Sequence, residues 1–371
     1  MRLARQRRNA DPHFRGRASA RKRLSFGPAE DRRGYERHGA ADAGEFAIAD
    51  FIRIAANPVP AHGEAIDFHG ADGGYLRAAI FATPGAQATV VLVSGRSEFI
   101  EKYFETISDL QSRGFAVATL DWRGQGLSER LLPVREKGHI RDFGAFRSDL
   151  SLFTDEIVRK RLPGPYILLA HSMGGAPVLQ MLADGDQRFC CAVLSSPMTR
   201  LFDNVAKRIG VRILAEGASR IGLSRYAIAG TREHSMAFEG NVLTSDLTRH
   251  ARFKDLQSAA PNATIREPTY GWLRAATEAM DDLHKPDRFA RLKTPTLILS
   301  AEDDHLVRSS DHNRLAGKSP LIERIVIKGA LHEIMMERDE IRDRFWKAFD
   351  EFVTPKIADG NHSKSELMTQ A

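Results

Sequence analysis

Short apolar runs alternate with longer amphipathic stretches through most of this chain. Near its start, residues Ala65–His69 and Leu76–Thr83 flank a Gly73-Gly74 turn and predict a β-hairpin. Six short, mostly apolar runs follow, and continuous apolar stretches such as VVLV and YILLA are typical of strands buried on both faces of a parallel sheet. These runs are Thr89–Val93, Val117–Leu120, Tyr166–Ala170, Cys191–Ser195, Thr296–Ser300 and Arg324–Ile327.

Amphipathic segments of helical length separate most of these runs: Lys102–Arg113, Phe143–Lys160 and Gly174–Asp184. Strands that alternate with helices predict βαβ units. We therefore expect an α/β fold, in which helices flank a mostly parallel central sheet. We assign this core to residues 46–197 and 286–354.

The alternation stops between Pro197 and about Pro286, where the pattern is helical and no clear strand is visible. In a helix expected over Leu201–Leu214, four apolar residues share one face: Leu201, Phe202, Val205 and Ile209. We interpret residues 198–285 as a helical lid inserted between two strands of the sheet. The chain is polar after Phe352, so residues 355–371 should form a polar tail that frays.

The composition agrees with a soluble globular protein. The 371 residues are 42% hydrophobic and 27% charged, which excludes a collagen, a coiled coil and a wholly disordered chain. No run of 18 apolar residues is present, so no membrane-spanning helix is predicted. The adjacent Cys190 and Cys191 exclude a disulfide scaffold and a multi-cysteine zinc site, and they are compatible with the cytoplasm, where we expect the protein to reside.

The net charge of +6 is unevenly distributed, because residues 1–37 carry +8 and the remainder carries −2. Residues 1–45 are rich in arginine and poor in aliphatic side chains, which predicts a basic disordered extension. Such an arm can contact an anionic membrane surface, so peripheral contact with the inner membrane is one interpretation. A solvated extension is the interpretation we favour, and no specific nucleic-acid partner is expected.

The segment Leu168–Pro177 (LLAHSMGGAP) carries the main chemical signal. A buried strand, a turn containing Ser172 and a helix follow one another, which is the context of a nucleophile elbow. Small residues two before and two after the serine, Ala170 and Gly174, suit such a sharp turn. The backbone N–H of Met173 would then face a developing oxyanion.

A nucleophilic serine needs a base and a group that orients the base, in the chain order Ser, acid, His on this type of fold. Downstream, a strand ends in acidic residues, of which Asp304 is our choice for the acid and Asp303 the alternative, with Glu302 less favoured. His332 follows the last strand, past a glycine, where a base would be delivered.

A second oxyanion donor is expected in the loop after Thr89–Val93, where Gly95 lets the backbone approach the substrate and the N–H of Arg96 is the candidate. We expect the nearby carboxylates of Glu98 and Glu101 to be surface charges. The loop 121–128 is interpreted as a structural brace at the rim of the site.

Several of these segments resemble the bacterial lysophospholipase branch of the α/β-hydrolases, which is similar to monoacylglycerol lipases and is grouped with serine aminopeptidase-like hydrolases. The segments are SGRSEFIEKYF, TLDWRGQGLSER, AHSMGG and GALHEIMMERD, together with NVLTSDLTRHARFKDL and PTYGWLRAA in the lid. The resemblance covers about residues 60–352. It implies a serine hydrolase with Ser172 as nucleophile, Asp304 and His332 as its partners, and Arg96 and Met173 as oxyanion donors.

The resemblance also implies an acyl substrate with a glycerol or glycerophospho head. The family usually has His-Gly where this chain has Ser94-Gly95, and a serine there could keep a hydrogen bond that organises the loop. Trp272 and Tyr270 could line an acyl pocket or belong to the core of the lid. No metal or organic cofactor is expected, since HEIMM lacks the second histidine of a zinc motif.

The sequence thus predicts a lysophospholipase or monoacylglycerol lipase that forms an acyl-enzyme on Ser172. The alternatives within the fold are a general esterase, a thioesterase, an acyltransferase and a peptidase. The alternative from another class is a non-catalytic protein that binds lipid or nucleic acid on a hydrolase scaffold.

Overall fold

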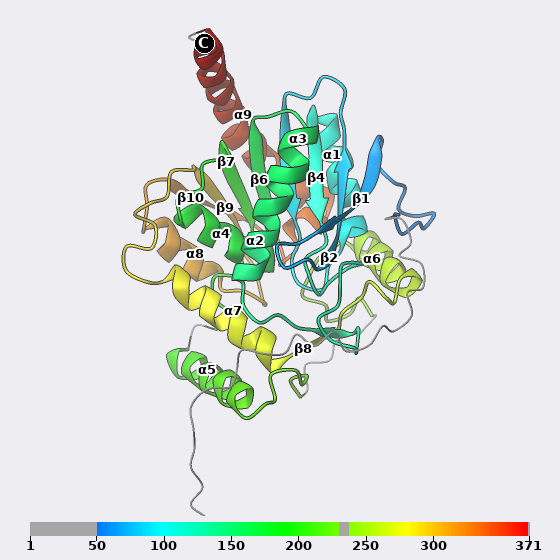
Figure 1. The fold of residues 1–371 in the computed structure, drawn as a ribbon, viewed down its shortest axis with the longest axis vertical. Helices are drawn as coiled ribbons and strands as arrows, with labels where there is room; N and C mark the ends of the chain where they lie inside the picture. Colours follow the sequence, from blue (N-terminus) through cyan, green and yellow to red (C-terminus); the bar gives the residue numbers. More distant parts are fainter. Residues whose placement is uncertain (1–49, 203, 230–236, 370–371) are drawn as a thin grey trace, which may run out of the picture. The chain divides into compact units, whose positions relative to one another are not determined.

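The computed structural model describes residues 50–369 except 203 and 230–236 (Figure 1). The basic extension predicted for residues 1–45 lies outside the described residues. Within the part of the chain that is described, no helix is both long and apolar enough to cross a membrane.

A single sheet of eight strands forms the centre of the fold, in the order β1-β2-β4-β3-β6-β7-β9-β10 (Figure 1). Its strands are β1 (Gly63–His69), β2 (Tyr75–Phe81), β3 (Ala88–Val93), β4 (Phe115–Leu120), β6 (Tyr166–His171), β7 (Cys191–Ser195), β9 (Thr296–Ala301) and β10 (Ile322–Ile327). The predicted hairpin is present as the antiparallel pair β1–β2. The β2–β4 pair is also antiparallel, and every later pair is parallel. The prediction of a mostly parallel sheet is therefore confirmed.

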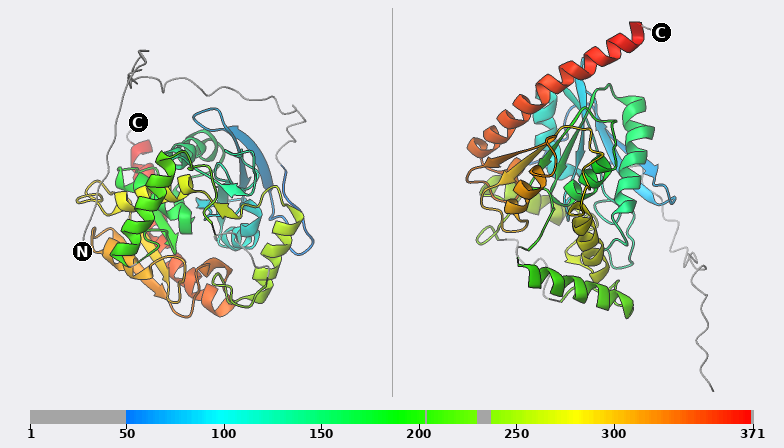
Figure 2. Two further views of the ribbon diagram at one scale, coloured as in Figure 1. Left: turned by 90° about the horizontal axis from the view of Figure 1, so that it is seen from below. Right: turned by 90° about the vertical axis from the view of Figure 1, so that its left-hand side faces the viewer.

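Helices cover both faces of this sheet (Figure 2). On one face, α1 (Phe104–Ser112) and α9 (Asp339–Thr369) bury phenylalanines and aliphatic side chains against the strands. The other face is covered by α2 (Gly144–Phe153), α4 (Gly175–Ala183) and α8 (Ser309–Ala316). A π-helical turn and α3 (Arg159–Arg161) continue α2. Burial on both faces explains why the central strands β3, β4, β6, β7 and β9 are mostly apolar. The edge strand β10 differs from this expectation, because several of its residues are exposed.

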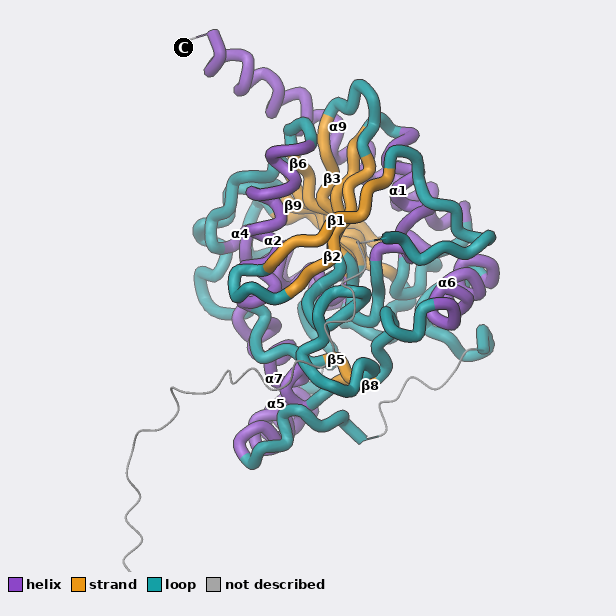
Figure 3. The backbone as a smooth tube through the Cα atoms, turned by 45° about the vertical axis from the view of Figure 1, so that its right-hand side comes forward, coloured by secondary structure: helices purple, strands orange, loops and turns teal. Residues whose placement is uncertain are grey.

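The lid region contains α5 (Val205–Arg220), α6 (Leu247–Ala259) and α7 (Tyr270–Leu283). It also contains the short strand β8 (Glu267–Pro268), which pairs with β5 (Lys137–Gly138) although no strand was expected there. In Figure 3, α5, α7, β5 and β8 are grouped beyond one end of the sheet. The chain enters the region after β7 and leaves it before β9, so the assignment of residues 198–285 as a lid stays a proposal consistent with this connectivity.

The first lid helix lies later in the chain than predicted. It begins at Val205 rather than Leu201, because the Asn204 side chain accepts a hydrogen bond from the Lys207 N–H at 2.9 Å and caps the helix. Leu201 and Phe202 therefore precede the helix. Val205 and Ile209, expected to share one apolar face of the helix, are 58% and 53% exposed.

The C-terminal segment also differs from expectation. Helix α9 does not end after Phe352 but continues to Thr369. Phe352, Val353 and Ile357 are buried against the core, so packing carries the helix past the point where the sequence becomes polar.

Candidate active site

Ser172 lies at a sharp turn between β6 and α4. Its φ of 47° is in the left-handed region, which side chains rarely adopt outside functional turns. A Cβ at Gly174 would lie 2.5 Å from the Ser94 carbonyl oxygen, and one at Gly175 would lie 2.5 Å from the Pro197 Cβ. The turn therefore requires glycine after the serine, whereas the fully buried Ala170 before it fits without difficulty.

Three side chains from separate segments form one hydrogen-bonded chain. The Nε2 atom of His332 lies 2.8 Å from the Ser172 Oγ, and its Nδ1 lies 2.8 Å from the Asp304 Oδ2. The His332 and Asp304 side chains are 4% and 0% exposed. This is the geometry of a nucleophile, a base and a group that orients the base.

The structure distinguishes among the acidic residues after β9. The other oxygen of Asp304 accepts hydrogen bonds from the N–H groups of Leu306 and Val307, both at 2.9 Å. Burial raises the pKa of Asp304. The hydrogen bond and charge of His332, together with the two N–H groups, lower this pKa by more than burial raises it, so the net shift is downward. Asp303 is exposed, and Glu302 accepts from the Gly329 N–H at 2.9 Å.

The loop 94–96 lies against the turn of Ser172. The Trp122 indole donates to the Ser94 carbonyl at 2.8 Å, and the Gly95 N–H donates to the carboxylate of Glu98. The Ser94 hydroxyl is buried and has no hydrogen-bond partner among the described residues, so the organising bond that a serine could make here is not seen. Met173 is buried at the start of the turn, and its role and that of Arg96 as oxyanion donors stay proposals.

The loop 121–128 braces this region as predicted. Beyond the Trp122 bond, Gln125 accepts from the Ser97 N–H at 2.7 Å, and Asp121 accepts from the Ile100 N–H at 3.0 Å.

The prediction that Glu98 and Glu101 are surface charges was wrong, since they are 4% and 0% exposed. Glu101 forms two hydrogen bonds with Arg77, at 2.8 and 2.9 Å. Glu98 pairs with Lys102 at 2.7 Å. The i, i+4 spacing of Glu98 and Lys102 could have indicated the second pair, although Glu98 lies before the 3-10 helix Ile100–Tyr103, whereas nothing local indicated the first pair.

Among the described residues, Glu98, His171 and Glu333 have ligand atoms within 4.8 Å of one another, a spacing that a metal ion could bridge. The ammonium of Lys102 bonds to both carboxylates, at 2.7 and 2.5 Å. Burial lowers the pKa of His171 to about 4. A built-in cation thus lies between the two carboxylates, and the residues do not fit a metal ion.

Of the predicted substrate residues, Gly95 is part of the loop 94–96 and Trp272 lies beside it. The Arg96 guanidinium carbon stands 5.2 Å from the centroid of the Trp272 ring, which is 9% exposed at the start of α7. Tyr270 is half-buried, and its N–H bonds to the Tyr226 carbonyl at 3.1 Å. Contact of these side chains or of Gly95 with a substrate stays a prediction.

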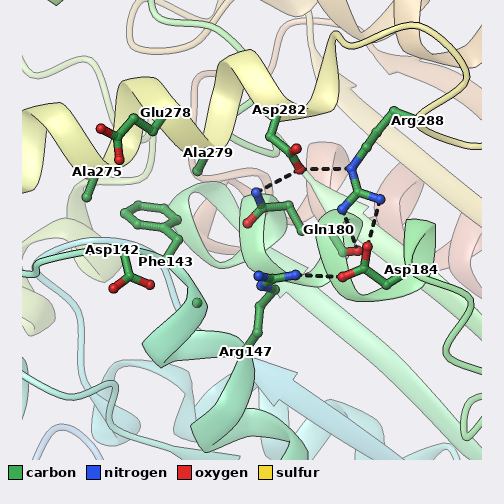
Figure 4. Close-up of a pocket in the computed structure, with 11 residues that line it drawn as sticks. Asp142, Phe143, Arg147, Gln180, Asp184, Ala275, Glu278, Ala279, Asp282 and Arg288 are labelled. Atoms are coloured by element: carbon green, nitrogen blue, oxygen red, sulfur yellow. Dashed lines mark hydrogen bonds and ion pairs between the residues drawn. The ribbon is translucent and has the colours of Figure 1, made fainter.

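Two cavities adjoin α7. The larger, of about 550 Å³, lies among α2, α4 and α7, and contains none of the three linked side chains (Figure 4). Both arginines of its lining pair with aspartates, Arg147 with Asp184 at 2.6 Å and Arg288 with Asp282 at 2.8 Å. The smaller, of about 240 Å³, lies between α5 and α7 and is lined by apolar side chains with three arginines.

Comparison with known proteins places the chain in a family. A family model described as serine aminopeptidase, S33, matches residues 84–339. The chain belongs to this family. It is 33% identical to lysophospholipase L2 of Escherichia coli K12 over 318 residues, which cover 81% of this chain and 90% of that protein. It is 24% identical to monoglyceride lipase of Rattus norvegicus over 295 residues, 78% of this chain and 89% of that protein.

Solved structures show the same fold. A soluble variant of monoglyceride lipase from Saccharomyces cerevisiae superposes with a TM-score of 0.65 at 17% identity, covering 82% of this chain and 99% of that one. The chain therefore has the α/β-hydrolase fold and lies on the branch of this family that contains lysophospholipase L2 and the monoglyceride lipases.

Proposed function

We propose that this protein is a serine hydrolase that cleaves carboxylic esters of lipids, as a lysophospholipase or a monoacylglycerol lipase. The observation that carries the proposal is the hydrogen-bonded chain from Ser172 through His332 to Asp304, with Ser172 held at φ 47° on the elbow.

The geometry supports a two-step reaction. His332 removes the proton from the Ser172 hydroxyl as its oxygen attacks the ester carbonyl, and the resulting oxyanion is held by the N–H groups of Met173 and Arg96. Asp304 fixes the ring of His332 and stabilises its cation. The proton passes to the departing alcohol, and water, activated by the same imidazole, then releases the fatty acid.

The lid supports a lipid rather than a small soluble ester. Helix α5 exposes Val205, Ile209, Ile213 and Leu214 to between 51% and 67%, on the same helix as Lys207, Arg208 and Arg212. Apolar side chains beside cationic ones are typical of helices that rest on a membrane or micelle surface. The named activities of lysophospholipase L2 and monoglyceride lipase agree with such a substrate.

A turnover panel tests the proposal. Lysophosphatidylcholine, a monoacylglycerol, a short p-nitrophenyl ester, an acyl thioester and a peptide amide are compared with the full chain and with Ser172→Ala. We expect kcat/KM to be greatest for one of the two lipids and to be abolished in the variant. Preference for the short ester, the thioester or the amide would contradict the lipid assignment, and transfer of the acyl group to an added alcohol in place of water would indicate an acyltransferase.

A further inference from the structure

A buried polar network adjoins the nucleophile and is not part of the linked triad. Its members are at most 7% exposed and come from three segments: Glu98, Lys102 and Tyr103 near α1, His171 before the elbow, and Glu333 after His332. Burying this many ionisable groups is costly unless they are paired.

Glu98 is the centre of the network. One oxygen of its carboxylate accepts from the Tyr103 hydroxyl at 2.6 Å and from the Gly95 N–H, and the other accepts from Lys102 at 2.7 Å. Burial raises the pKa of Glu98, but Lys102 and its other partners together lower it to about 2. Burial also raises the pKa of Tyr103, so its hydroxyl keeps the proton that it donates.

The bond from Gly95 matters because it fixes a peptide plane. The Ser94–Gly95 peptide is held at its carbonyl by the Trp122 indole and at its N–H by Glu98. The next N–H along the chain is that of Arg96, the proposed oxyanion donor. Since the Ser94 hydroxyl has no partner among the described residues, it does not orient this peptide.

The network also reaches the base. Lys102 links Glu98 to Glu333, the residue after His332, at 2.5 Å. The rings of His171 and His332 are 5.0 Å apart. The loops that carry the oxyanion donor and the base are thus joined through one ammonium group.

We propose that Glu98, supported by Tyr103 and Lys102, is a positioning residue that fixes the Ser94–Gly95 peptide and thereby directs the next N–H, that of Arg96, toward the oxyanion. The proposal rests on the hydrolase function proposed above. Glu98 touches no reacting atom, and it acts by holding the donor in place before the charge develops.

The test uses the full chain with Glu98→Gln and Tyr103→Phe. Gln has the shape of Glu but cannot accept from Gly95, Tyr103 and Lys102 at once, because one of its two terminal atoms is a donor. We expect kcat per active site to fall roughly 10- to 100-fold in Glu98→Gln and about 3- to 10-fold in Tyr103→Phe. These decreases are at most about as large as the decrease in kcat caused by removing a direct oxyanion donor. KM should stay within about threefold, because the donor acts in the transition state.

A tetrahedral mimic separates this role from general damage to the fold. Affinity for a trifluoromethyl ketone analogue of the substrate should fall by the same factor as kcat/KM. Active sites are counted with a fluorophosphonate so that misfolded protein does not contribute. Asp186→Asn is the matched control. Asp186 is 10% exposed, and its carboxylate pairs with Arg188. It precedes β7 and therefore lies at the opposite end of the strands from Ser172.

The control should keep kcat per active site within about threefold. An equal loss in Asp186→Asn, unchanged kcat in Glu98→Gln, or a loss confined to KM would overturn the proposal. If Glu98→Gln does not fold, Tyr103→Phe decides, and unchanged kcat and analogue affinity there would overturn it. A parent protein that neither hydrolyses esters nor reacts at Ser172 would overturn the proposed function as well, so the two failures are distinguishable.

Discussion

The surroundings of Ser172, at the carboxyl end of the central strand β6, and the helix α5 differ in how their side chains are buried. Around Ser172, side chains are buried and paired, with His332 4% exposed between its two partners. On α5, apolar side chains such as Ile213, 67% exposed, face outward. The difference is that the polar side chains around Ser172 are held by one another, whereas α5 carries apolar side chains that the described residues leave uncovered.

The largest effect should come from the acid. Asp304→Asn would keep the shape of the side chain but remove the charge that orients and stabilises His332, so kcat should fall by roughly 10³ to 10⁴. The adjacent Asp303→Asn is the matched control and should change kcat less than about threefold, because Asp303 is exposed. Steady-state kinetics check both, and equal losses in the two variants would show that the core site is not arranged as described.

A second effect follows from buried histidines of the core. Burial lowers the pKa values of His171 and His312 to about 4, and His312 is held neutral between Ser300 and the Pro197 carbonyl at 2.8 Å each. Above about pH 6.5, the folded and unfolded chains both hold neutral imidazoles. Below it, only the unfolded chain takes up these protons, so stability should decline as the pH falls toward 4.

For two such groups the free energy of unfolding should decrease by up to roughly 2 to 3 kcal/mol per pH unit. Denaturant unfolding at a series of pH values from 7 to 4 measures this decline. Because α5 contains no histidine, this helix should not contribute to the effect. A free energy of unfolding that stays constant over this range would contradict the assignment of neutral buried rings.

The smallest effect is expected in the lid. The measured quantity is the ratio of activity on a lipid ester in vesicles to activity on a short soluble ester. Replacing Ile209 and Ile213 with serine should lower this ratio by about tenfold, because partial burial of two such side chains in the lipid surface is worth roughly 1 to 2 kcal/mol. Ile325→Ser, on β10 and 40% exposed, is the control and should leave this ratio unchanged. A lid variant with the parent ratio would show that α5 does not contact the lipid surface.

Much of this architecture was predictable because the order of polar and apolar residues within each short segment indicates its secondary structure. The strands were placed to within a few residues, since runs such as Tyr166–Ala170 must be apolar to be buried on both faces. The order of Ser172, Asp304 and His332 along the chain suggested the triad, and the structure brings the three together.

The errors arose where packing over long distances outweighs local character. Glu101 is buried only because Arg77, 24 residues earlier, reaches it. Helix α9 continues past Phe352 because Ile357 is buried against the core, and this packing stabilises the later turns. Glu98 accepts a hydrogen bond from the backbone N–H of Gly95, a partner that no side-chain pattern reveals.

The most direct test of the central claim is to treat the folded full-length protein with a fluorophosphonate and map the modified peptide by mass spectrometry. The account predicts one phosphonate per chain on Ser172, none on Ser172→Ala, and slow labelling when His332 is replaced by glutamine. No adduct on folded protein, or an adduct on a different serine, would contradict it.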